Sequence, residues 1–236
     1  MHHVVVERWN RTTSPLHSVD ARAKFGALLF FLIAVSTTPP PAQIAFAAYA
    51  ALLSVLVIVS RLPFVGLAER AALVLPFSAT FAAITWWSGN PISALALLEK
   101  SFLSGLGALL LIGTTPLPQL VGALDSLGAP RTLLLVIQFL YRYLFVISEQ
   151  GQHMRLAARS RQGSGRGGTS RFRAAAGALG VLFARSSERA DGIYRAMLAR
   201  GFQGRFPLSA PPSFSLRDGL FLAGAALLCV TTRVVL

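Results

Sequence analysis

Five stretches of the chain are apolar enough, and long enough, to cross the hydrocarbon layer of a lipid bilayer. They cover residues 21–38, 42–60, 70–88, 93–114 and 216–235. A helix needs roughly 20 mostly apolar residues to cross a hydrocarbon layer about 30 Å thick. Charged residues make up only 13% of the chain, against about 25% in soluble domains. The sequence therefore predicts an all-α, polytopic membrane protein with about five transmembrane helices.

A sixth apolar run, residues 132–148, contains Arg142 and precedes the most basic part of the chain. Residues 150–205 hold 11 of the 22 Lys and Arg residues, opposed by only two acidic residues. The positive-inside rule predicts that this segment is cytoplasmic, and that the basic N-terminus is cytoplasmic as well. Four spans then return the chain to the cytoplasm near Thr115, and a fifth crossing would export the arginines. We therefore expect residues 132–148 to begin a long helix that stays on the cytoplasmic side.

These patterns divide the chain into three parts. The first part, residues 1–115, is an N-terminal cytoplasmic segment followed by four spans. The second, residues 116–206, is a cytoplasmic domain of three helices, and the third, residues 207–236, is the last span. Breakers such as Gly and Pro place the three cytoplasmic helices over about 116–127, 130–160 and 170–200.

The two longer cytoplasmic helices are joined by a glycine-rich segment and end in similar tripeptides. The glycines are Gly163, Gly165, Gly167 and Gly168, and we expect them to form a flexible hinge. The tripeptides are Ala158-Arg159-Ser160 and Ala199-Arg200-Gly201. An arginine near a helix C-terminus can simply satisfy free carbonyls and the helix dipole. Two such ends in one domain favour a further role, in which each planar guanidinium enters a groove on a separate partner subunit.

Enzymatic, metal-binding and nucleic-acid-binding roles find little support in the sequence. No HExxH spacing and no GxxxxGK[ST] loop is present, and Cys229 is the only cysteine, so no disulfide or cysteine cluster can form. The histidines are His2, His3, His17 and His153. We predict no metal site and no cofactor on this chain. The net charge of +13 is typical of nucleic-acid-binding proteins, but here the arginines lie between apolar spans, which argues against that class.

Several motifs together resemble one transporter family. The pattern Ser-x-Leu-His-x-x-Asp-x-Arg-x-Lys is formed by Ser14, Leu16, His17, Asp20, Arg22 and Lys24. A Leu-Gly-x-Pro-Arg turn occupies residues 127–131, and residues 185–205 read RSSERADGIYRAMLARGFQGR. With the two tripeptides, these motifs resemble the transmembrane T component of energy-coupling-factor (ECF) transporters, and above all the cobalt-transport Q subunit. Ala21 replaces the usual proline, and Ser160 replaces the usual glycine.

The resemblance covers essentially the whole chain and implies a non-catalytic coupling subunit in the cell (inner) membrane. Its partners would be two cytoplasmic ABC ATPases, which bind ATP and Mg, and a membrane S component that binds the substrate. The tripeptides at 158–160 and 199–201 would dock the ATPases. Cobalt is the expected cargo, with nickel or a vitamin as the alternative. A conventional permease with its own substrate path is a second alternative, although Glu99 and Lys100 face different directions on their helix. Whether the spans number five or six, the stoichiometry and the role of His2 and His3 stay open.

Overall fold

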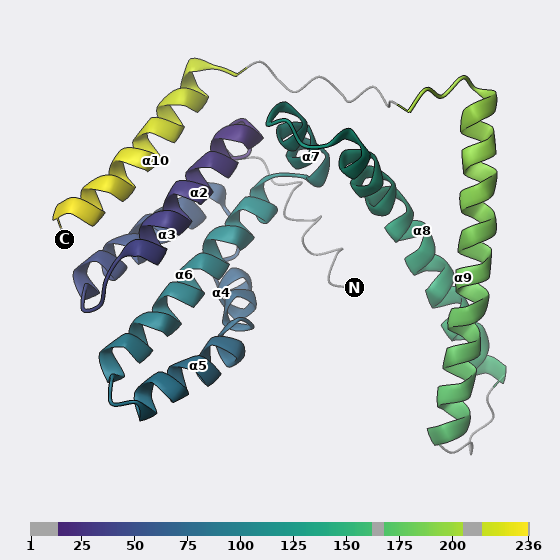
Figure 1. Ribbon diagram of the computed structural model, residues 1–236, viewed down its shortest axis with the longest axis horizontal. Coiled ribbons are helices and arrows are strands. Elements are labelled where there is room, and N and C mark those ends of the chain that lie inside the picture. Colours follow the sequence, from purple (N-terminus) through teal and green to yellow (C-terminus); the bar gives the residue numbers. More distant parts are fainter. Residues whose placement is uncertain (1–13, 162–167, 205–213, 236) are drawn as a thin grey trace. The chain divides into compact units, whose positions relative to one another are not determined.

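The computed structural model describes residues 14–161, 168–204 and 214–235, and within these residues it contains helices and no β-strand (Figure 1). The chain divides into two compact units. One, which we call the bundle, comprises residues 1–124 and 210–236. The other, residues 125–209, is the α8–α9 unit. The predicted all-α fold is confirmed, and each unit is described by itself below.

The bundle is organised around one long central helix, α6. Its helices are α2 (Ala21–Thr37), α3 (Gln43–Ser60), α4 (Phe64–Ala72), α5 (Leu75–Trp87), α6 (Pro91–Thr114), α7 (Leu117–Ser126), which crosses the unit boundary, and α10 (Leu216–Val235). Helix α6 packs against α2, α3, α4 and α5, while α10 packs against α2 and α3. Phe31, Tyr49 and Leu67 lie in the buried core.

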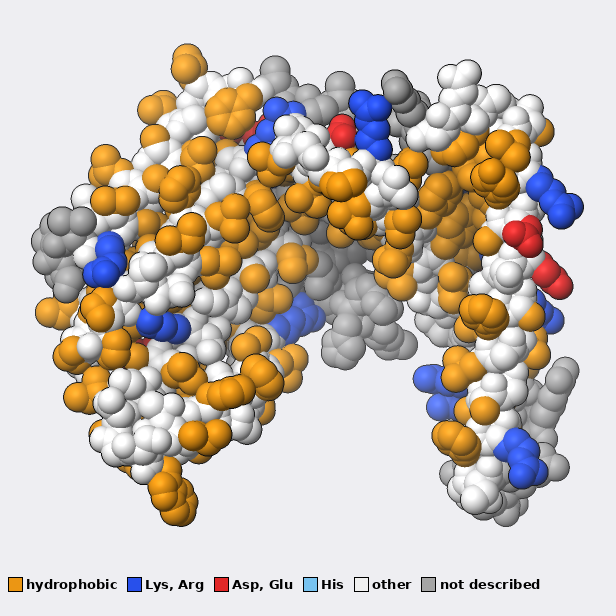
Figure 2. Space-filling view, viewed as in Figure 1, with side chains coloured by type: hydrophobic (Ala, Val, Ile, Leu, Met, Phe, Trp, Pro, Cys, Tyr) orange, Lys and Arg blue, Asp and Glu red, His pale blue; other side chains and the backbone are white. Residues whose placement is uncertain are grey.

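Large apolar side chains also cover the outside of the bundle, as the space-filling view shows for one face (Figure 2). Ile58 is 73% exposed, Phe77 71% and Trp87 90%. Contact of so much apolar surface with water is unfavourable, whereas lipid tails are as apolar as the side chains themselves. Helices α3 and α6 are long and apolar enough to cross a membrane, as is α8 (Arg131–Arg161) of the other unit, and α4 with α5 is a fourth candidate if the pair counts as one span. The chain is therefore a polytopic membrane protein.

The third expected span differs from the continuous helix that the apolar run 70–88 suggested. The structure instead has α4 and α5, whose axes are bent by 51°. Pro76 at the start of α5 gives the physical reason. A proline has no backbone N–H, and its ring clashes with the carbonyl four residues earlier, here that of Ala72, at which α4 ends.

Hydrogen bonds show which helix ends share one end of the bundle. The backbone N–H of Asp20, at the start of α2, donates to Oδ1 of Asp218 in the first turn of α10, at 2.9 Å. Lys24 Nζ donates to the carbonyl of Thr114 at the end of α6, at 3.0 Å. The chain therefore leaves the bundle after α6 and returns at α10 at the same end. Helix α7, about 15 Å long, is too short to cross the hydrocarbon layer of about 30 Å.

This arrangement bears on whether α8 crosses the membrane. If the bundle spans the bilayer, the chain between α7 and α10 must cross an even number of times, or not at all. Helix α8 is long and apolar enough for one crossing, but α9 (Gly168–Ala199) is not among the candidate spans. A single crossing by α8 would violate this parity, and the location of α8 on one side of the membrane stays a prediction.

The α8–α9 unit is a pair of long helices that pack against each other. Their 31 and 32 residues correspond to lengths of about 46 and 48 Å at 1.5 Å per residue. Together with α7 they match the three helices predicted from the sequence, and each bound agrees within two residues. The division of the chain into membrane and cytoplasmic parts stays a prediction.

Candidate partner-docking site

The C-terminal end of α9 is closed by a Schellman motif that places Arg200 at the helix end. The N–H of Phe202 donates to the carbonyl of Met197, and the N–H of Gly201 donates to that of Leu198, both at 3.0 Å. These are the two bonds of the motif, which requires a left-handed residue after the cap. Gly201 supplies it with φ +77°, so the predicted helix stop at this glycine is confirmed.

The first tripeptide lies in the last turn of α8. Arg159 and Ser160 are exposed, and Ala158 is half-buried. The Ser160 hydroxyl donates to the carbonyl of Ala157 at 3.0 Å, and so stays on its own helix. The helix continues to Arg161. Of the predicted hinge, Gly168 is the first residue of α9, and Gly163, Gly165 and Gly167 lie outside the described residues.

Both arginines of the tripeptides are exposed side chains. Within residues 14–161, 168–204 and 214–235, neither guanidinium has a hydrogen-bond or ion-pair partner. An arginine carries five N–H donors in a planar arrangement that matches carboxylates and carbonyls. Arg159 and Arg200 therefore keep their full donor capacity for a group on another molecule.

The two arginines lie near different ends of the pair. Six residues separate the end of α8 from the start of α9, so Arg159 is close in sequence to the N-terminal end of α9. Arg200 follows the opposite end of α9, which is about 48 Å away at 1.5 Å per residue. Figure 1 shows α9 returning along α8 after the connecting segment. One small groove cannot hold both arginines, and the geometry suits two separate binding sites.

Between these ends the two helices expose a wide apolar surface. Aromatic and aliphatic side chains from both line a hollow of about 350 Å³, among them Phe139 and Tyr143 of α8, and Ile193 and Met197 of α9. Leu140 is 63% exposed and Phe183 77%. Large exposed apolar patches on a protein mark surfaces that bind a partner or a membrane. The exposed apolar side chains on the two helices are Leu133, Val136, Leu140, Leu144, Phe145, Ile147, Leu156, Phe172, Leu179, Val181, Phe183, Tyr194 and Leu198.

The N-terminal motif forms a separate junction at the end of the bundle where α2 and α10 start. Ser14 Oγ and His17 Nδ1 are 2.7 Å apart, and Asp20 caps α2 by accepting a hydrogen bond from the N–H of Arg22 at 2.8 Å. Lys24 lies in the first turn of α2 and is only 5% exposed. The motif residues thus fix where the first helix of the bundle begins, rather than forming a site open to a partner.

Sequence reasoning missed one member of this junction, Asp218. Its carboxylate accepts hydrogen bonds from the N–H of Asp20, and from the N–H and hydroxyl of Ser215 at 2.9 and 2.8 Å. Ser215 followed three residues later by an acidic residue is a recognisable helix-start signal. The bond to Asp20, 198 residues away, has no signal in a single sequence.

Comparison with protein families identifies the chain. The model of the CbiQ family, described as cobalt transport protein, matches residues 12–209. The chain belongs to the CbiQ family. The match includes the N-terminal junction up to Lys24, both tripeptides and the connecting glycines, whereas α10 lies beyond it. As a CbiQ-family member the chain is a membrane component of cobalt transport, a class that is generally non-catalytic.

Individual relatives agree with this assignment. The cobalt transport protein CbiQ of Rhodobacter capsulatus is 28% identical to this CbiQ-family chain over 196 residues, which are 78% of this chain and 79% of the relative. An uncharacterized protein of Methanocaldococcus jannaschii is 23% identical over 242 residues, covering 93% of this chain and 82% of its own length. Both alignments extend over most of each protein, so the similarity is not confined to one motif.

Proposed function

We propose that the chain is the transmembrane coupling subunit, or T component, of an ECF-type ABC importer that takes up cobalt. Two cytoplasmic ATPases would bind ATP and Mg and supply the energy, and a membrane S component would bind the ion. The observation that carries this proposal is the pair of exposed arginines, Arg159 and Arg200, at the ends of two crossing helices with no partner among the described residues. Family membership supports the cargo.

The separation of the two arginines supports binding to two ATPase subunits rather than one. With Arg159 in one ATPase and Arg200 in the other, each subunit would hold one end of the α8–α9 unit. When the ATPases close on ATP, they would change the distance between their two docking points. The helices would then change their crossing angle at the glycine-rich segment 162–168, which has the composition of a flexible connection.

The apolar surface of α8 and α9 would transmit this movement to the S component. Side chains such as Leu140 and Phe183 are exposed on long, rigid helices, so a change of crossing angle displaces them together. An apolar partner surface that packs against them would be carried along. The chain itself needs no catalytic group for this role, because it converts one movement into another.

The proposal includes a topology, in which the N-terminus and the α8–α9 unit are cytoplasmic and the bundle lies in the cell (inner) membrane. Two observations support it. Residues 150–205 hold half of all Lys and Arg residues, as expected for a cytoplasmic segment. The chain also leaves and re-enters the bundle at one end, as the bonds of Lys24 and Asp218 require.

The substitution Arg200→Glu tests the docking role. Removing a buried, charge-assisted contact at an interface costs about 2–5 kcal/mol, so we expect binding of the co-expressed ATPases to weaken at least about 30-fold. Arg195→Glu is the matched control, because Arg195 is also exposed on α9 and the change in net charge is identical. Co-purification of the ATPases and uptake of radioactive cobalt into cells are the measurements. The docking role is wrong if Arg200→Glu and Arg195→Glu retain the ATPases and transport cobalt equally well.

A further inference from the structure

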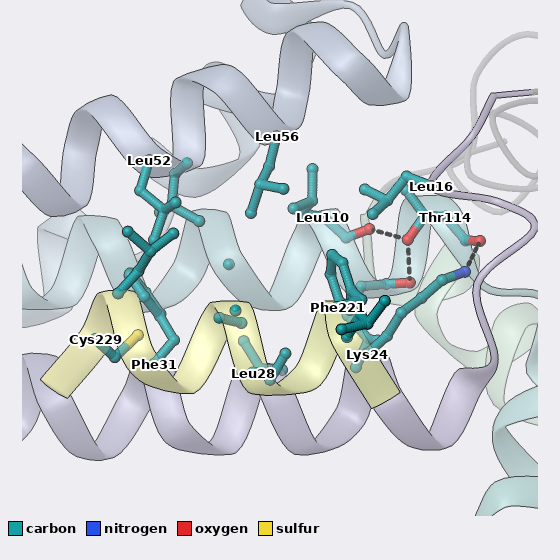
Figure 3. Close-up of a pocket in the computed structure, with 18 residues that line it drawn as sticks. Leu16, Lys24, Leu28, Phe31, Leu52, Leu56, Leu110, Thr114, Phe221 and Cys229 are labelled. Atoms are coloured by element: carbon teal, nitrogen blue, oxygen red, sulfur yellow. Dashed lines mark hydrogen bonds between the residues drawn. The ribbon is translucent and has the colours of Figure 1, made fainter. Parts of the chain in front are cut away.

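The bundle carries a lysine near each of its two ends, and the surroundings of the two lysines differ. At the N-terminal junction, Lys24 lines one end of an apolar cavity of about 290 Å³ among α2, α3, α6 and α10 (Figure 3). The carboxylates of Asp20 and Asp218 both act on its charge. The positive charge at this end is therefore compensated within the bundle.

Lys100 of α6 lies at the opposite end, where α2 and α10 finish. Its Nζ donates to the carbonyl of Ser36, in the last turn of α2, at 2.9 Å. That carbonyl finds no N–H further along the chain, because Pro39 and Pro40 occupy the next two positions that could donate to it. The ammonium also lies 6.0 Å from the centre of the Phe46 ring. Lys100 thus caps α2, and both of these contacts are with neutral groups.

The charged group that acts on Lys100 is a second cation, Arg233, in the last turn of α10. Arg233 is exposed, and among the residues that the structure describes neither cation forms an ion pair with a carboxylate. Glu99 precedes Lys100, but adjacent helical residues face different directions. The carboxylates of the junction lie about 21 Å away at 1.5 Å per residue, because they share the end of the bundle at Thr114. Two positive charges therefore lie near each other at this end.

Exposed aliphatic side chains lie one helical turn deeper in the bundle than these polar groups. Ile33 precedes Ser36 on α2 by three residues, and Val230 precedes Arg233 on α10 by three residues, so each pair shares a helix face. Both aliphatic side chains are more than half exposed. A ligand at this end thus meets positive charge at the helix ends and apolar surface beneath it. A membrane lipid presents its phosphate and its acyl chains in the same order, whereas a free phosphate ion uses only the charge.

We propose that Lys100 and Arg233 bind the phosphate of a phospholipid in the leaflet away from the N-terminal junction, with its acyl chains against Ile33 and Val230. An ammonium has three N–H donors and a guanidinium five, and the Ser36 carbonyl uses one of them. Two cations favour a lipid of net negative charge, such as phosphatidylglycerol, over phosphatidylethanolamine, whose own ammonium they repel. The bound phosphate holds together the ends of α6 and α10, whose charges otherwise repel each other.

Native mass spectrometry of the full chain tests this proposal. The protein is released from nanodiscs of equal parts phosphatidylglycerol and phosphatidylethanolamine, and its most tightly retained phospholipid is identified. We expect phosphatidylglycerol on the wild type. Losing a hydrogen bond to a charged group weakens binding by about tenfold or more, so Lys100→Gln and Arg233→Gln should each lower its retention by that factor. Lys100→Arg, which keeps the charge, should preserve it.

Arg217→Gln is the matched control, because it removes the same charge from an exposed position of α10 at the junction end. It should retain phosphatidylglycerol like the wild type, and thermal unfolding identifies any variant that fails to fold. Equal retention of the two lipids by the wild type overturns the proposal, as does retention of phosphatidylglycerol by Arg233→Gln at the level of Arg217→Gln. Displacement of the lipid by inorganic phosphate at equal concentration also overturns it, since the site then takes a free anion. A membrane partner protein that both Gln variants lose, with lipid retention unchanged, would identify a protein carboxylate as the ligand instead.

Discussion

Replacement of Asp218 by alanine should detach α10 from the start of α2. The Asp218 carboxylate is 6% exposed and accepts three hydrogen bonds, two of them from the backbone N–H groups of Asp20 and Ser215. Leaving one buried donor unpaired costs about 1–3 kcal/mol. The Ser215 hydroxyl can rotate to another acceptor, but the two backbone donors cannot. Only the Asp20 N–H is buried, whereas Ser215 is exposed, so the loss there is that of a helix cap, about 0.5–2 kcal/mol. The substitution should therefore destabilise the fold by about 2–5 kcal/mol in all.

Thermal unfolding of the purified chain in detergent, followed by circular dichroism, measures this loss. For a chain of 150–250 residues, each kcal/mol lowers the Tm by about 2–4 °C. We expect the Tm of Asp218→Ala to fall by roughly 10 °C on this scale, and that of Asp218→Asn, which keeps one carbonyl acceptor, to fall by about half as much.

Arg217→Ala is the control for this experiment, because Arg217 is an exposed neighbour in the same helical turn and its loss should leave the Tm unchanged. A double-mutant cycle with Ser215→Ala separates the local cap of α10 from the bond to Asp20. An Asp218→Ala protein that melts within 2 °C of the wild type, on a scale of about 2–4 °C per kcal/mol, would refute the reasoning. The long-range bond would then contribute nothing to the stability of the bundle.

Two further experiments test the helix end and the topology. Gly201→Ala should destabilise the chain by about 1 kcal/mol, because a Cβ is strained at φ +77°. The control is Gly192→Ala, inside α9 with open space around the added Cβ, which should be neutral or stabilising. Equal melting temperatures of the two variants would contradict the Schellman geometry. The topology is tested in a Cys229→Ser background with an impermeant maleimide applied to intact cells. The reagent should label Asn90→Cys, in the exposed α5–α6 turn, and should not label Arg173→Cys on α9. Labelling of Arg173→Cys would refute the cytoplasmic location of the α8–α9 unit.

Much of the fold can be predicted from local patterns in the sequence. Apolar runs of sufficient length predict α2, α3, α6 and α10, and the breakers Pro116, Gly128 and Pro130 delimit α7 and α8. Gly201 predicts the end of α9 because few other residues adopt its left-handed conformation. In each case the information lies within a few residues of the feature.

The break between α4 and α5 was within reach of the same reasoning and was missed. The apolar run 70–88 dominates a hydropathy argument, so Pro76 did not count as a breaker. Helix-breaking prolines are tolerated inside membrane spans, which is why the presence of Pro76 alone does not decide between a kink and a break. The structure shows a bend of 51°, together with a separate helix, α4, that begins at Phe64.

The cavity and the N-terminal junction lie beyond local patterns. Lys24 contacts residues 114 and 115, and Asp20 contacts Asp218. Motif residues such as Asp20 and Lys24 were recognised from the sequence, but their partners depend on which helices pack together. The role of Arg159 and Arg200 stays a prediction for a related reason, since their proposed partners are on other chains.

The position of α10 has a consequence for how the protein is made. The partner of the Asp20 N–H is Asp218, near the end of the chain, and Gly26 of α2 lies against Leu222 of α10, whose Cδ1 would be 3.0 Å from an added Cβ. All residues between α2 and α10, including the arginine-rich segment, must therefore emerge from the ribosome before α2 acquires this second neighbour besides α6. Until then this face of α2 must be covered by lipid or by the insertion machinery. Nascent chains arrested before residue 216 should consequently crosslink from this face of α2 to lipid or to the insertion machinery, and lose that crosslink only when the final helix is added.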